Sequence, residues 1–87
     1  MTPEEITAKV RVGMTREEVI TALGPPDDVG GGSRKYPVPS VWKYGDVELH
    51  FINSRYDAEG RGYSWPGPLV FIYMENEDHT EGWTLLK

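Results

Sequence analysis

The chain has 87 residues, a formal net charge of −5 and no cysteine, and its length fits one domain, residues 1–87, with one modest core. The negative charge argues against nucleic acid and anionic membranes as partners, because binding phosphate requires a basic face, and it is compatible with a basic protein partner. The lack of cysteine excludes a disulfide framework, a thiolate metal site and a cysteine nucleophile.

A first short helix is predicted over about residues 3–12. Residues 2–5, Thr-Pro-Glu-Glu, form a capping box in which the Thr hydroxyl accepts the third helical N–H and the second Glu reaches back to the cap. Ile6 and Val10 recur at i and i+4 and would face a core. Gly13 is placed to end this helix as its C-terminal cap.

A second capping box, Thr-Arg-Glu-Glu at residues 15–18, predicts a helix over about residues 16–23. Its predicted apolar stripe consists of Val19, Ile20 and Leu23. Gly24 closes the helix, and the Pro-Pro pair that follows forbids its continuation. Each helix has fewer than three turns, so both must pack on another element to be stable.

The segment 25–39 is predicted to be a loop, because it holds four of the seven prolines and three consecutive glycines. A hairpin follows, with strands at about residues 40–44 and 47–52 joined by Gly45-Asp46. A two-residue turn at this position places Tyr44 opposite Val47 and sets the register of the whole hairpin.

This register divides the hairpin into two faces. The expected core face carries Trp42, Tyr44, Val47, Leu49 and Phe51. The expected outer face carries Val41, Lys43, Glu48, His50 and Ile52. Lys43 and Glu48 lie directly opposite each other on the outer face, which favours a small stabilising contact.

The segment 53–68 is predicted to be irregular, and two further strands are predicted at about residues 69–75 and 83–86. The strand at 69–75 is apolar on both faces, which is typical of a central or covered strand. The expected fold class is therefore α+β. We expect two short N-terminal helices packed on one face of a three- to four-stranded antiparallel sheet, in two layers.

One stretch of the sequence resembles a known family. Val12-Gly13-Met14-Thr15-Arg16-Glu17-Glu18-Val19, followed by Leu23-Gly24-Pro25-Pro26, is similar to the opening of the SmpA/OmlA (BamE-like) proteins and of the repeat in secreted beta-lactamase inhibitor protein. The resemblance covers mainly residues 10–52. It implies a bacterial protein with two helices on an antiparallel sheet. The matching residues are helix caps, turn residues and core residues, so the resemblance predicts the fold rather than a chemical activity.

The expected location is the cytoplasm. The chain holds no run of 18 apolar residues that could span a membrane. Residues 1–5 include two glutamates and lack the apolar region of a signal peptide. It also lacks the cysteine of the membrane-assembly lipoproteins and the cysteines of the secreted inhibitor. These differences argue against an envelope-assembly role, which the lipoprotein relatives imply, and that role is kept as an alternative.

The residue types that carry chemistry predict no catalytic, metal or cofactor site. His50 and His79 are the only histidines, and each is expected to be a solvated surface residue, whereas a metal site needs three or four converging ligands. The carboxylates gather in hydrophilic turns, where nothing raises a pKa for acid–base work. Residues 30–35, Gly-Gly-Gly-Ser-Arg-Lys, lack the end of a phosphate-binding loop and are interpreted as a connector.

The favoured hypothesis is a non-catalytic protein–protein interaction module, of which an inhibitor or immunity protein is one version. Because two helices can cover only one sheet face, the other face is free to meet a partner. The expected partner-binding residues are Val41, Lys43, Glu48, His50 and Ile52, with Tyr63 and Trp65 at the rim. Aromatic residues in the segment 53–68 can be recognition anchors or can tuck under the loop as a satellite cluster.

The rival hypothesis is an enzyme or small-ligand-binding domain built on the loops 25–39 and 53–68. A deep pocket lined by His50 or by carboxylates would favour it, and a flat or filled surface would count against it. The oligomeric state expected from the sequence is a monomer or a weak homodimer.

Overall fold

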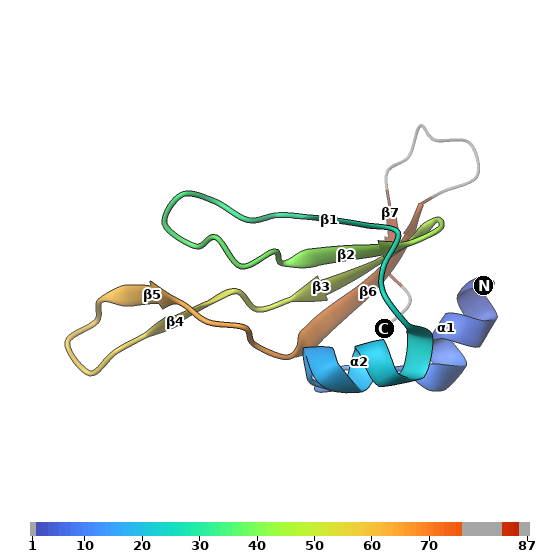
Figure 1. Ribbon diagram of the computed structural model, residues 1–87, viewed down its shortest axis with the longest axis horizontal. Coiled ribbons are helices and arrows are strands. Elements are labelled where there is room, and N and C mark those ends of the chain that lie inside the picture. Colours follow the sequence, from blue (N-terminus) through green and yellow to red (C-terminus); the bar gives the residue numbers. More distant parts are fainter. Residues whose placement is uncertain (1, 76–82, 86–87) are drawn as a thin grey trace.

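An antiparallel sheet of five strands, in the order β1-β2-β3-β6-β7, forms the framework of the protein (Figure 1). The computed structural model describes residues 2–75 and 83–85. The helices are α1 (Pro3–Lys9) and α2 (Arg16–Leu23). The strands are β1 (Asp28–Gly30), β2 (Val41–Tyr44), β3 (Val47–Phe51), β4 (Ser54–Tyr56), β5 (Gly62–Ser64), β6 (Leu69–Glu75) and β7 (Trp83–Leu85). The α+β class is confirmed, and the sheet has one strand more than expected.

Both capping boxes form as predicted. The Thr2 hydroxyl accepts the Glu5 N–H at 3.2 Å, and the Glu5 carboxylate accepts the Thr2 N–H at 3.4 Å. In α2 the Thr15 hydroxyl accepts the Glu18 N–H at 3.2 Å, and the return bond is 3.0 Å long. These pairs satisfy N–H groups that a helix start leaves without partners, so each helix begins at a residue that its own sequence specifies.

The end of α1 differs from the prediction. The helix ends at Lys9 rather than near residue 12, and the residue after it, Val10, is already extended and fully buried. Gly13 is not the helix cap: its N–H donates to the carbonyl of Leu69 at 2.7 Å, and Met14 accepts from the Leu69 N–H at 2.9 Å. Pairing of the inter-helix segment with the start of β6 therefore stops the helix early.

The end of α2 is the predicted one. Gly24 has φ +81° and ψ −171°, a backbone region that is essentially restricted to glycine. Its N–H donates to the Ile20 carbonyl at 2.7 Å. Its own carbonyl accepts the Tyr44 hydroxyl at 2.8 Å, which ties the end of α2 to the β2–β3 hairpin.

The core lies between the two helices and one face of the sheet. It consists of Ile6, Val10, Val19, Tyr44, Val47, Leu49, Phe51, Leu69 and Ile72. Met14, Ala22, Leu23 and Trp42 pack against it while staying partly exposed. The predicted stripe on α2 was wrong at Ile20, which is 39% exposed. Since successive helical residues are about 100° apart, burial of Val19 turns Ile20 away and brings Leu23 back to the core.

The β2–β3 hairpin has the predicted register. Tyr44 lies opposite Val47, and Lys43 lies opposite Glu48. Strand β6 pairs on the far side of β3, with a bulge between His50 and Phe51. The alternation predicted for β3 is confirmed by its burial, because Val47, Leu49 and Phe51 are buried and the two residues between them are half-buried.

Two regions predicted to be loops contain strands. In the segment 25–39, β1 pairs with β2 along its three residues, although all three are exposed. In the segment 53–68, β4 and β5 form a separate two-stranded sheet. Its turn is organised by Asp57, whose carboxylate accepts the N–H groups of Glu59 and Arg61 at 3.0 and 2.8 Å. An aspartate whose side chain accepts hydrogen bonds from the backbone that follows it stabilises a turn. Such a turn does not require the apolar alternation by which strands are predicted from a sequence.

Two arms, residues 31–40 and residues 53–68, extend beyond the same end of the sheet (Figure 1). They contact each other where the hydroxyl end of Tyr36 lies against Gly62, so that a side chain at position 62 would have to displace the tyrosine. The Asn53 side chain also donates to the Val38 carbonyl at 3.2 Å. The arms are therefore braced against each other rather than independent.

Arg16, the first residue of α2, links this helix to the root of both arms. It is 9% exposed, and its two terminal nitrogens donate to the carbonyls of Pro39 at 2.6 Å and Ile52 at 2.9 Å. The guanidinium carbon lies 4.7 Å from the centre of the Phe51 ring. Burial lowers the pKa of Arg16, and the nearby Glu17 carboxylate partly opposes this effect.

Candidate interaction surface

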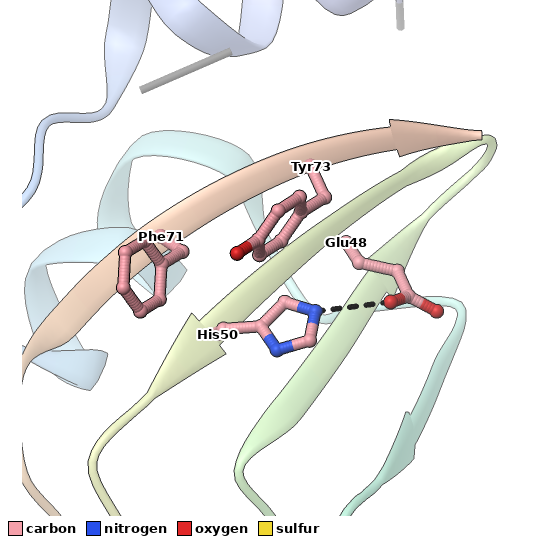
Figure 2. A pocket seen from close by; sticks show the side chains of 4 residues that line it. All are labelled: Glu48, His50, Phe71 and Tyr73. Atoms are coloured by element: carbon pink, nitrogen blue, oxygen red, sulfur yellow. Dashed lines mark hydrogen bonds and ion pairs between the residues drawn. The ribbon is translucent and has the colours of Figure 1, made fainter. Parts of the chain in front are cut away.

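The face of the sheet opposite the helices has no covering layer among the residues that the structure describes. In Figure 2 its side chains stand in front of the strands and the helices lie behind. The five residues predicted for this face are all half-buried: Val41, Lys43, Glu48, His50 and Ile52. For the four residues in β2 and β3, half-burial follows from their setting, because each is flanked by neighbouring strands and is open above. Ile52 follows the end of β3.

Strand β6 contributes two aromatic residues to this outer face that the sequence analysis did not single out. Phe71 lies opposite His50, and Tyr73 lies opposite Glu48. Phe71 is 46% exposed, whereas Ile72 beside it is fully buried on the core face. Two features of the sequence could have indicated them: the segment 69–75 is apolar on both faces, and two short helices can cover only one face of the sheet. Together these features predict exposed apolar side chains on the other face.

Glu48, His50, Phe71 and Tyr73 line an open hollow of about 370 Å³ (Figure 2). The His50 and Tyr73 rings meet edge to face, with centres 4.9 Å apart and planes at 75°. The Phe71 and Tyr73 ring centres are 5.7 Å apart. Both separations fall in the range at which aromatic rings attract, so the rings hold one another in place without a covering layer.

The polar side of the hollow is an imidazole–carboxylate pair. His50 Nε2 lies 3.0 Å from Glu48 Oε1, and the two side chains are 31% and 16% exposed. The second carboxylate oxygen, Oε2, has no hydrogen-bond partner in the part of the chain that the structure describes. In Figure 2 this oxygen lies on the side of the carboxylate that faces away from His50, and it keeps its capacity to accept a hydrogen bond from a ligand at this edge of the hollow.

The other residues predicted for the surface are not among those that line the hollow. Lys43 lies between Asp28 of β1 and Glu48 of β3 in register, without an ion pair to any described residue. Ile52 follows β3 at the root of the arms, where its N–H donates to the Pro68 carbonyl at 3.0 Å. Val41 lies opposite His50 on β2.

Tyr63 and Trp65, predicted for the rim, belong to the arm of residues 53–68 and do not line the hollow. The Arg55 guanidinium carbon lies 4.8 Å from the centre of the Trp65 ring. Tyr56 and Tyr63 are 68% and 44% exposed. The arm thus carries an aromatic group of its own, separate from the outer-face hollow.

The charges are distributed unevenly between the arms and the rest of the chain. The arms hold four basic residues, Arg34, Lys35, Arg55 and Arg61, and two acidic ones, Asp57 and Glu59, for a net charge of +2. The chain as a whole carries −5, so the remainder carries −7. The hollow lies in this acidic remainder.

Within residues 2–75 and 83–85 no three histidine or acidic side chains converge in a way that could hold a metal ion. His79 and the acidic residues at 77, 78 and 81 lie outside the described residues. Among the described helices none has the length and apolar character needed to cross a membrane.

Comparison of the chain with protein-family models, with curated proteins and with solved structures gives no match in any of the three. The resemblance to the SmpA/OmlA proteins therefore stays a prediction.

Proposed function

We propose that this protein is a non-catalytic protein-binding module, with the outer face of the sheet as its binding surface. The observation that carries the proposal is a sheet face that none of the described residues covers, on which the aromatic side chain of Phe71 is 46% exposed. Aromatic side chains on a rigid framework are the residues that most often anchor protein interfaces. An inhibitor or immunity protein is the version of this role that a small acidic domain suits best.

The proposed contact set keeps Val41, Lys43, Glu48, His50 and Ile52 and adds Phe71 and Tyr73. All seven are presented by three hydrogen-bonded strands or lie next to their ends, so a partner would meet them without a backbone change. Tyr63 and Trp65 would join the contact only with a partner large enough to reach the arm.

The test uses a photo-crosslinking amino acid at one position at a time in cells of the native host. Phe71, which is 46% exposed on the outer face, is paired with Val12, which is 50% exposed in the segment between the helices. The expected result is a discrete protein crosslinked from position 71 and not from position 12. Crosslinking to no protein from position 71, or to the same proteins from both positions, would contradict the proposal.

The crosslinked protein is then purified and titrated against three variants of the chain. Phe71→Ser is expected to weaken binding by about tenfold or more, because a buried aromatic anchor contributes more than 1.4 kcal/mol to many interfaces. Val12→Ser should bind as the unchanged chain does. Trp65→Ala reports whether the partner extends to the arm.

A second candidate function is the binding of a small ligand in the hollow of Glu48, His50, Phe71 and Tyr73. The observation that favours it is the hollow lined by His50 and Glu48, which is open, whereas the feature expected of a ligand-binding domain was a deep pocket lined by His50 or by carboxylates. The hollow lies on β3 and β6, not on the loops 25–39 and 53–68 that the sequence suggested. A thermal-shift screen tests this candidate: stabilisation lost in Phe71→Ser and kept in Val12→Ser would favour it.

Three further expectations belong to the same proposal. A cytoplasmic location is favoured by the cysteine-free composition, and fractionation of host cells tests it against an envelope-assembly role. A monomer or weak homodimer is expected, and sedimentation over a range of concentrations measures it. Membership of a bacterial SmpA/OmlA-like group would gain support from a crosslinked partner that is itself an envelope protein, a result that would also count against the cytoplasmic location.

A further inference from the structure

The hollow on the outer face combines two features that together select a positive charge. Three rings, from His50, Phe71 and Tyr73, form its walls, and the Glu48 carboxylate lies at one side. The faces of aromatic rings attract cations through their quadrupole. A carboxylate whose side chain is only 16% exposed attracts them more strongly than a fully solvated one does.

The carboxylate has acceptor capacity left for a ligand. Glu48 Oε1 is engaged by His50 Nε2 at 3.0 Å, whereas Oε2 has no hydrogen-bond partner among the described residues. When the imidazole is neutral and donates from Nε2, its Nδ1 is a second acceptor. The hollow therefore offers acceptors beside aromatic surface, and its four lining residues include no lysine or arginine that would supply a charged donor for an anion.

A guanidinium group fits this combination better than an ammonium group does. It is planar, stacks on rings, is weakly hydrated and carries five N–H donors, whereas an ammonium is a compact and strongly hydrated charge. The protein uses this pairing internally in two places. Arg16 lies over Phe51 at 4.7 Å while donating to carbonyls, and Arg55 lies over Trp65 at 4.8 Å.

The charge of the surrounding protein acts in the same direction. The described residues outside the two arms carry a net charge of −5, and the hollow lies among them. Such a field raises the local concentration of cationic groups and speeds their association. Lys43, in register with Glu48, makes no ion pair with it, so the carboxylate is not already neutralised by its cross-strand neighbour.

From these observations we infer that the hollow is a receptor for an arginine side chain supplied by a basic segment of a protein partner. The inference rests on the proposed function and names the chemistry of the partner. The guanidinium would lie against the aromatic rings of the hollow and donate to the Glu48 carboxylate.

The test is an NMR titration of the ¹⁵N-labelled protein with three capped tripeptides, Gly-Arg-Gly, Gly-Lys-Gly and Gly-citrulline-Gly. Citrulline keeps the shape of arginine and removes its charge. The arginine peptide is expected to shift the amides of β3 and β6 around the hollow and to saturate in the millimolar range, as suits a single side chain. The lysine peptide should bind more weakly, and the citrulline peptide should cause no saturable shift.

Two variants and a matched control locate the site. Glu48→Gln keeps the shape of the side chain and should weaken arginine binding by about tenfold, the loss expected for one charge-assisted hydrogen bond. Phe71→Leu keeps an apolar side chain without the ring and should also weaken it. Glu17→Gln removes an acidic residue on exposed helix surface and should leave binding unchanged. Well-dispersed spectra of all three establish that each variant is folded.

Equal shifts from the arginine and citrulline peptides would overturn the inference, as would unchanged arginine binding by Glu48→Gln. Shifts confined to residues away from β3 and β6 would also overturn it. The crosslinked partner separates this failure from that of the proposed function. If the partner binds Glu48→Gln fully but not Phe71→Ser, the arginine receptor is wrong and the protein-binding face stands. If it binds Phe71→Ser fully, the proposed function is wrong.

Discussion

The two faces of the strands β2, β3 and β6 come from alternating residues of the same segments, yet they have opposite characters. On the inner face Val47, Leu49 and Ile72 are at most 1% exposed and lie under the helices. On the outer face their immediate neighbours His50 and Phe71 remain accessible. A step of one residue along a strand thus separates the residues that stabilise the fold from those available for recognition. Either set can therefore change with little effect on the other.

The largest expected effect of a single change is on the inner face. Leu49→Ala should reduce the free energy of unfolding by about 2–5 kcal/mol, because Leu49 is completely buried at the centre of the sheet and its truncation leaves a cavity. Denaturant unfolding measures the loss. A loss below about 1 kcal/mol would mean that this face is not the core.

A change at the link between α2 and the arms should have the next largest effect. Arg16→Ala removes the partner of the Pro39 and Ile52 carbonyls and the cation over Phe51, and should cost about 2–3 kcal/mol. Arg16→Lys should recover only part of this, because an ammonium lacks the planar fork that reaches both carbonyls. Arg11→Ala, at an exposed position, is the control and should unfold within about 0.5 kcal/mol of the unchanged chain.

A smaller effect, visible in alkali, is expected at Tyr44. Burial, aided by the negative charge of Asp27, raises the pKa of Tyr44 to about 12, while an unfolded tyrosine titrates near 10. The folded state thus holds this proton more tightly. The stabilisation is complete below pH about 10 and is lost as the pH rises through about 12.

Two measurements test this expectation. Alkaline titration of tyrosinate absorbance should show one residue ionising well after the others. Tyr44→Phe should remove that late step and should lower stability by about 1 kcal/mol at neutral pH, because the Gly24 carbonyl loses its donor. A single titration step for all five tyrosines would show that Tyr44 is not buried in solution.

The smallest effect on stability is expected on the outer face. Phe71→Ser should lower the free energy of unfolding by about 1 kcal/mol or less, since the ring is 46% exposed and the change removes its contact with the Tyr73 ring. Paired with Leu49→Ala in the same denaturant series, it measures the contrast between the two faces directly. A loss comparable to that of Leu49→Ala would show that the outer face is part of the core.

The elements that sequence analysis placed correctly are those whose signals are local. Both helix starts depend on a threonine and a glutamate three residues apart, and the end of α2 depends on one glycine. The β2–β3 register follows from a two-residue turn, and its alternation assigned each side chain to the correct face. Four of the seven candidate surface residues, Val41, Lys43, Glu48 and His50, therefore lie on the outer face to which the alternation assigned them.

What the sequence missed was decided by contacts between distant segments. The early end of α1 depends on pairing with Leu69, and β1 exists because β2 offers it a partner, with no apolar pattern of its own. Phe71 and Tyr73 belong to the candidate site because β6 pairs with β3, which places them beside His50 and Glu48. Caps and turns act within a few residues and can be recognised in the sequence itself, whereas strand pairing and the uncovered face depend on which distant segments meet.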